Sequence, residues 1–100
     1  MLGGMSKTER RLRDVADRVK RVREELALAD AQLAELSAIS DSLEVDAAIG
    51  TGLDQAEHRS AVRHADKMRR HRTELVAELA RLEAQQDQLL DQMLAEGSRT

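Results

Sequence analysis

The sequence predicts an all-α protein: a long antiparallel two-helix coiled-coil hairpin that dimerises into a four-helix bundle. Three observations lead to this prediction. The 100 residues contain no proline and no aromatic residue, which disfavours a compact globular core, and Ala, Leu, Glu and Arg dominate, as in long helices. Apolar residues recur every three or four positions, which is the heptad repeat of a coiled coil. The sequence Gly-Thr-Gly at residues 50–52 interrupts that repeat near the middle of the chain.

The first helix is expected over residues 6–49, after a disordered leader at residues 1–5. Ser6 and Glu9 have the spacing of a capping box, in which each side chain serves a free backbone amide of the first turn. The apolar positions that follow form one heptad stripe, here called the seam, and are Leu12, Val15, Val19, Val22, Leu26, Ala29, Leu33, Leu36, Ser40, Leu43 and Ala47. Only Ser40 is polar among them, so the stripe predicts a continuous contact face.

The second helix is expected over residues 53–96, after a turn at residues 50–52. Glycine at position 50 suits the residue after a helix end, and Gly97 is a natural stop before a tail at residues 98–100. The seam of this helix runs through His58, Ala61, Ala65, Met68, Arg72, Leu75, Leu79, Leu82, Gln86, Leu89 and Met93. Residues 6–97 are therefore expected to form a single hairpin domain.

The charge pattern predicts that the chain folds back on itself. Four blocks alternate in sign: net +5 over residues 7–23, −9 over 24–57, +5 over 59–72 and −5 over 74–96. Folding at Gly-Thr-Gly sets basic blocks beside acidic ones, whereas parallel pairing of two continuous helices sets like charges side by side. Exposed ion pairs are worth only about 0–1 kcal/mol each, so the pattern selects orientation more than it adds stability.

The fold-back also predicts a register. Pivoting at residue 51 makes the numbers of facing residues sum to about 102, so that His58 meets Glu44 and Arg72 meets Asp30 across the small Ala29. Polar seam residues of this kind set register at some cost in stability.

A second apolar stripe predicts a homodimer interface. Val62, Val76 and Leu90 lie at heptad spacing beside the seam of the second helix, and Leu28 and Ile39 lie outside the seam of the first. A lone hairpin leaves these side chains partly exposed, and exposed apolar stripes mark interfaces. Pairing of two hairpins into a four-helix bundle, or docking onto a larger partner, would cover them.

Enzymatic chemistry and bound cofactors are not expected. The chain has no cysteine, and its three histidines are spaced six and seven residues apart, too far for two to share one metal ion on a helix. There is no phosphate-binding glycine loop, and a thin hairpin offers no pocket for a catalytic triad. No stretch reaches the ~18 apolar residues of a membrane span, and no signal peptide is recognised, so a cytoplasmic protein without membrane contact is expected.

The basic face of the second helix is a candidate partner-binding surface. It consists of Arg59, Arg63, Lys67, Arg69 and Arg70. Such cations can contact nucleic-acid phosphates, but the chain has no aromatic residue to stack on bases. Nucleic-acid binding is therefore the weakest of the functions considered.

The acidic tip is a second candidate surface. Asp41, Glu44, Asp46, Asp54 and Glu57 cluster around the turn, and no Lys or Arg occurs between residues 24 and 58. A long hairpin that carries carboxylates at its end resembles, in shape and charge, the coiled-coil arm of Gre-type transcript-cleavage factors. That resemblance implies action in the secondary channel of RNA polymerase, but it covers the hairpin only, without the second domain of that family.

A second resemblance is to the two-helix anti-sigma factors that bind cyclic di-GMP, whose helices carry Glu-x3-Ser-x2-Arg-x3-Gln-x3-Asp. Ser60 and Arg63 match this pattern, whereas Lys67 and His71 replace its Gln and Asp, and Glu57 lies one residue out of register. The chain is assigned to neither family.

The functional expectation is a non-catalytic protein–protein interaction module, a coiled-coil adaptor or regulator of a larger partner. The alternative is a transcription regulator that binds RNA polymerase or a sigma factor through the acidic tip or the basic face.

Overall fold

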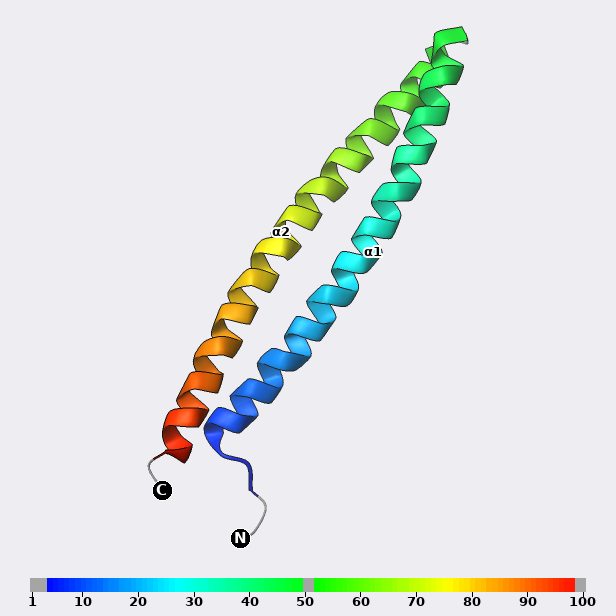
Figure 1. Cartoon of the computed structure of the whole chain (residues 1–100). Helices are drawn as coiled ribbons and strands as arrows, with labels where there is room; N and C mark the ends of the chain where they lie inside the picture. Colours follow the sequence, from blue (N-terminus) through cyan, green and yellow to red (C-terminus); the bar gives the residue numbers. More distant parts are fainter. Residues whose placement is uncertain (1–3, 50–51, 99–100) are drawn as a thin grey trace. The chain divides into compact units, whose positions relative to one another are not determined.

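Two long helices make up the protein. The computed structural model describes the backbone of residues 4–49 and 52–98 and, within these ranges, the side chains outside positions 40, 43–49 and 52–54. Helix α1 spans Lys7–Ile49 and helix α2 spans Gly52–Gly97 (Figure 1). The described residues contain no β-strand. The prediction of an all-α helical hairpin is therefore confirmed, while dimerisation remains a prediction.

The helix ends fall within one residue of the expected positions. Helix α1 begins at Lys7 rather than residue 6, and α2 ends at Gly97, one residue later than expected. Gly52 was expected in the turn, but it is the first residue of α2. Residues 50 and 51, the rest of the expected turn, lie outside the described residues. So do residues 1–3 of the expected leader and residues 99 and 100 of the expected tail.

The chain divides into two compact units, each built from a segment of both helices. Unit 1 comprises residues 1–24 and 76–100, and unit 2 comprises residues 25–75. Within each unit the α1 and α2 segments run in opposite directions beside one another (Figure 1).

Ser6 caps the N-terminus of α1, as its spacing to Glu9 predicts. The Ser6 Oγ accepts a hydrogen bond from the Glu9 backbone N–H at 3.1 Å, and the Ser6 carbonyl accepts one from the Arg10 N–H at 3.0 Å. At the C-terminus of α2, the Ser98 N–H and hydroxyl both donate to the Leu94 carbonyl, at 3.0 and 2.9 Å. These contacts satisfy backbone groups that a helix end otherwise leaves unpaired.

The seam forms the core of both units. In unit 1 the buried apolar side chains are Val15, Val19, Val22, Leu82 and Leu89. In unit 2 they are Ala29, Ala65 and Leu75. All other predicted seam residues whose side chains are described are half-buried, and the predicted members Ser40, Leu43 and Ala47 lie outside the described side chains. The heptad pattern thus identified the contact face of each helix.

Unit 1 also contains a buried polar residue that the apolar pattern did not include. Thr8 is 5% exposed, and its hydroxyl donates a hydrogen bond to the Glu96 carboxylate at 2.7 Å. Thr8 lies seven residues before Val15, and Glu96 lies seven after Leu89, so both continue the seam. A heptad count that admitted polar as well as apolar residues would have predicted this pair.

Candidate interaction surfaces

Among the side chains that the structure describes, six large apolar ones are exposed to solvent. Leu28, Ile39 and Val62 belong to unit 2, and Val76, Leu90 and Leu94 belong to unit 1. The three residues of the predicted dimer interface, Val62, Val76 and Leu90, are 37%, 43% and 38% exposed. Their exposure is as expected, and the dimer interface itself remains a prediction. Leu94, the most exposed of the six at 67%, was not predicted, although it follows Leu90 by one helical turn.

Among the described side chains, one ion pair joins the two helices in each unit. In unit 1, Arg23 Nη2 lies 3.4 Å from Glu83 Oε2. In unit 2, Arg72 Nε donates to Asp30 Oδ1, which is the contact that the register predicts. The other expected pair, His58 with Glu44, cannot be placed because the Glu44 side chain lies outside the described residues, although His58 itself is half-buried.

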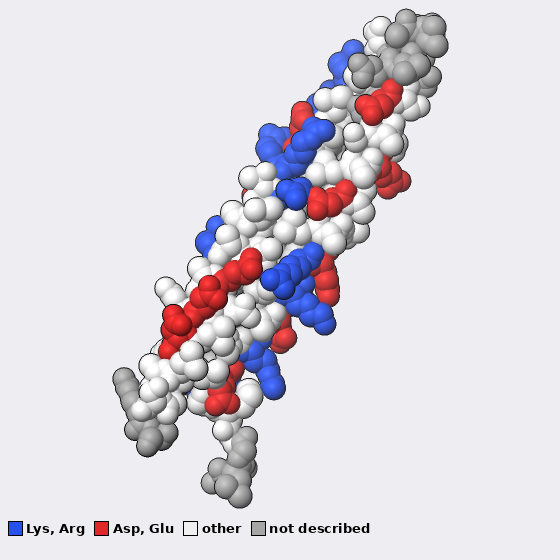
Figure 2. Space-filling view, in the orientation of Figure 1, with Lys and Arg blue, Asp and Glu red and all other residues white. Residues whose placement is uncertain are grey.

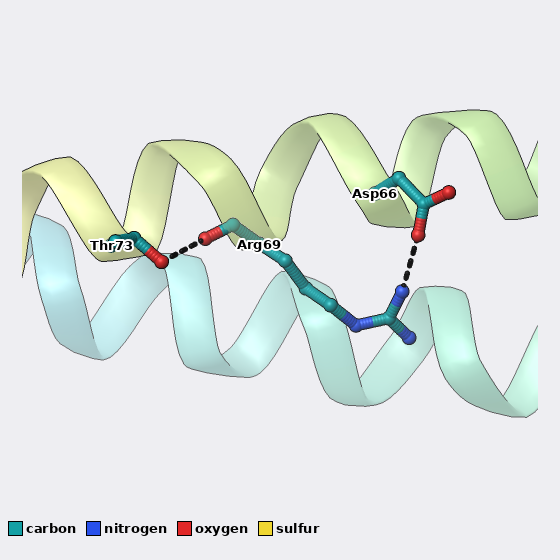
Figure 3. Close-up of polar contacts among 3 residues, drawn as sticks. All are labelled: Asp66, Arg69 and Thr73. Atoms are coloured by element: carbon teal, nitrogen blue, oxygen red, sulfur yellow. Dashed lines mark hydrogen bonds and ion pairs between the residues drawn. The ribbon is translucent and has the colours of Figure 1, made fainter.

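The basic face of α2 is only partly neutralised. Arg69 Nη1 lies 2.7 Å from Asp66 Oδ1, three residues earlier in the same helix, and the Arg69 carbonyl accepts a hydrogen bond from the Thr73 hydroxyl at 3.0 Å (Figure 3). The other four residues of the face are exposed, and none of them has an ion pair with a described residue. They are Arg59, Arg63, Lys67 and Arg70. Opposite charge blocks therefore do not neutralise each other residue by residue.

The acidic tip is described at two of its five positions. Asp41 and Glu57 are exposed, and neither makes an ion pair with another described residue. The side chains of Glu44, Asp46 and Asp54 lie outside the described residues. Whether the five carboxylates converge therefore remains a prediction.

Two open grooves adjoin each other in unit 2. One, of about 530 Å³, is lined by Ser60, Arg63, His64, Asp66, Lys67 and Arg70. The other, of about 280 Å³, is lined by Gln32, Glu35, Leu36, Ile39, His64 and Met68. His64 lines both, so a polar, mainly cationic groove and a more apolar groove share one wall. The sequence analysis did not identify His64 as part of a surface site.

A third groove lies in unit 1, between the seam and the polar surface. It has a volume of about 560 Å³ and is lined by Arg11, Asp14, Val15, Arg18, Gln85, Gln88, Leu89 and Gln92. Its lining carries two basic residues, Arg11 and Arg18, one acidic residue, Asp14, and three glutamine amides.

The described part of the chain contains neither a cluster of metal-binding side chains nor a helix suited to span a membrane. Its His, Asp and Glu residues nowhere form a group of three that could hold a metal ion. Neither helix, over its described residues, combines the length and apolarity that crossing a bilayer requires.

Comparison with known proteins assigns no family to the chain. No protein-family model matches it, and neither the curated proteins nor the solved structures give a significant match.

Proposed function

We propose that this protein is a non-catalytic protein–protein interaction module, a coiled-coil adaptor or regulator of a larger partner. The observation that carries the proposal is that six large apolar side chains among the described ones stay exposed although the seam is formed. Exposed apolar surface of this kind is typical of interaction sites, because its burial against a partner is favourable by about 25 cal/mol per Å². The proposal places the module in the cytoplasm.

Self-association is one form of this proposal. A two-helix hairpin buries one stripe of each helix, and Val76 and Leu90 lie outside that stripe on α2. Two copies that pack these stripes together would form a four-helix bundle with two-fold symmetry. A larger partner that presents an apolar helix face would cover the same residues.

A narrower form is a regulator of RNA polymerase or a sigma factor that acts through the acidic tip. Asp41 and Glu57, both exposed and without an ion pair among the described residues, support it.

The test uses a variant that removes apolar surface in unit 1, Val76→Gln with Leu90→Gln. The matched control is Ala77→Gln with Ala84→Gln, which adds the same side chains at two exposed positions of the same helix. Sedimentation equilibrium measures self-association, and affinity capture with cross-linking from host lysate measures partner binding. We expect the wild type and the alanine-site control to associate or to capture a partner. The apolar variant should lose this association and keep its helicity by circular dichroism.

Two results would contradict the proposal. One is a wild-type chain that sediments as a monomer and captures no partner. The other is an apolar variant that associates as well as the wild type, since that would show the exposed side chains to be ordinary surface.

A further inference from the structure

The basic residues of unit 2 all lie on one of its two helices. All six Lys and Arg residues of this unit lie on α2, between Arg59 and Arg72, and the α1 segment of the unit contains only acidic charges. On the face drawn in Figure 2, Lys and Arg side chains gather over the part of α2 that Figure 1 colours light green to yellow. Unit 2 therefore presents a cationic surface that is one helix wide.

Four of these six cations are available to a partner. Arg72 pairs with Asp30 of α1, and Arg69 pairs with Asp66. The remaining four, Arg59, Arg63, Lys67 and Arg70, are exposed and make no ion pair within the described part of the chain, and are here called the unpaired strip.

The unpaired strip follows one side of α2. Its members are spaced four, four and three residues apart, which keeps them along one side of a helix over about 16 Å of axis. The seam residues Ala61 and Ala65 occupy the side that packs against α1, where Ala65 is buried. Three of the four strip residues line the 530 Å³ groove, together with Ser60 and His64.

The groove beyond His64 adds apolar surface to the cationic strip. Leu36, Ile39 and Met68 line it, and Ile39 is 43% exposed. Because His64 belongs to both grooves, a ligand lying along α2 would contact cations on one side and apolar side chains on the other. That combination fits an amphipathic helix with an acidic face.

We propose that the unpaired strip and the groove beside it bind an acidic amphipathic helix of a protein partner. The inference rests on the proposed function, since it names the chemistry of the partner. Carboxylates spaced three and four residues apart on a helix recur every ~5–6 Å along its axis, the same step as the cations of the strip. The planar guanidinium groups of Arg63 and Arg70 can each grip a carboxylate through two parallel hydrogen bonds.

Two features favour a protein over a nucleic acid. The chain has no aromatic side chain on which a base could stack. The α1 segment of the same unit carries Glu25, Asp30, Glu35 and Asp41 and no basic residue, so a long polyanion that follows the strip would meet repulsion beside it. An acidic amphipathic helix can direct its carboxylates toward the strip and its apolar side toward the groove, whose lining carries one carboxylate, that of Glu35.

The experiment measures fluorescence anisotropy of a labelled synthetic helix of about 20 residues, with Glu on one face and Leu beside it. A second peptide with Gln in place of Glu and a DNA duplex of similar length are the comparison probes. The strip variant is Arg63→Glu, Lys67→Glu and Arg70→Glu. The matched variant is Arg13→Glu, Lys20→Glu and Arg21→Glu, which makes the same charge change at exposed residues of unit 1.

We expect the acidic peptide to bind the wild type and to bind the strip variant at least about tenfold more weakly, because each reversal replaces an attraction with a repulsion. The matched variant should change the dissociation constant by less than about twofold, and added salt should weaken binding to the wild type. Circular dichroism checks that each variant is helical. If the strip variant fails to fold, the milder set Arg63→Gln, Lys67→Gln and Arg70→Gln replaces it. This set should also weaken binding of the acidic peptide.

A second pair of variants tests the apolar groove. Ile39→Gln should weaken binding of the acidic amphipathic peptide, whereas Leu28→Gln, which changes a more exposed residue outside both grooves, should not. Equal effects of the two changes would overturn the assignment of the groove.

Three results would overturn the proposal: no binding of the acidic peptide to the wild type, equal weakening by the strip and matched variants, or tighter binding of the duplex than of the peptide. The last would reassign the strip to nucleic acid. A failure here, combined with loss of association in the Val76→Gln, Leu90→Gln variant, would leave the proposed function standing. If the peptide-binding experiment and the association experiment both fail, the proposed function and the acidic-helix proposal are both wrong.

Discussion

Arg72 shows what a single polar residue does on the seam. It occupies a position where the heptad pattern elsewhere places apolar side chains, and its guanidinium Nε donates to the carboxylate of Asp30 on α1. The side chains of Arg72 and Asp30 are 43% and 52% exposed, so water screens the pair and its energy is small. Its effect is on register, because a shift of one helix along the other would separate the two charges.

A double-mutant cycle tests the strength of this pair. We expect Asp30→Asn and Arg72→Gln, measured singly and together by urea denaturation, to give a coupling energy of about 0.2–1 kcal/mol. The control cycle is Arg23→Gln with Glu83→Gln, whose partners lie 3.4 Å apart, and it should give a smaller coupling. A coupling of zero for Asp30 and Arg72 would show that the contact plays no part in setting the register.

At the scale of the elements, each helix has one buried stripe and a solvated remainder. On α2, Leu75, Leu82 and Leu89 repeat at seven-residue intervals and are 4–6% exposed. Leu94, on the same helix but off that stripe, is 67% exposed. Leucines of one helix therefore differ in burial according to their heptad position.

Replacing leucine on and off the stripe measures this difference. We expect Leu82→Ala to lower the free energy of unfolding by about 2–5 kcal/mol, because it removes buried methyl groups and leaves a cavity in unit 1. Leu94→Ala should change it by less than about 0.5 kcal/mol. Thermal and urea denaturation followed by circular dichroism measure both. Similar values for the two variants would contradict the assignment of the seam.

At the scale of the whole chain, charge is segregated far more strongly than the net charge of −3 indicates. The blocks differ in sign, yet the described side chains form only two ion pairs between α1 and α2, Arg23 with Glu83 and Arg72 with Asp30. Most charged side chains point into solvent instead. Apolar burial along the seam, rather than ion pairing, is therefore the main source of stability.

The salt dependence of unfolding tests whether apolar burial or ion pairing is the main source of stability. Raising the ionic strength from about 0.1 M to 1 M shortens the Debye length from about 10 to 3 Å, and should change the free energy of unfolding by less than about 1 kcal/mol. Urea denaturation at the two salt concentrations measures the change, with the Arg23→Gln, Arg72→Gln double variant as the control that lacks both pairs. A loss of several kcal/mol in the wild type, absent from the control, would show that ion pairs hold the helices together.

Heptad periodicity and local capping chemistry determined most of the fold from the sequence alone. The seam, the Ser6 cap and the contact of Arg72 with Asp30 all follow from spacing along the chain, because helix geometry converts spacing into position. Thr8 and Glu96 escaped prediction because a polar residue on the seam does not stand out in an apolar pattern.

The tertiary structure alone decided which charges are satisfied. The sequence shows six cations between Arg59 and Arg72 and predicts the partner of Arg72. Only the packed side chains show that Arg69 turns back to Asp66 and that the other four cations make no ion pair within the described part of the chain. It also placed His64 between a cationic groove and an apolar one. Periodicity predicts the face on which a residue lies, whereas the choice of one carboxylate among several neighbours depends on side-chain conformations and distances that exist only in the folded chain.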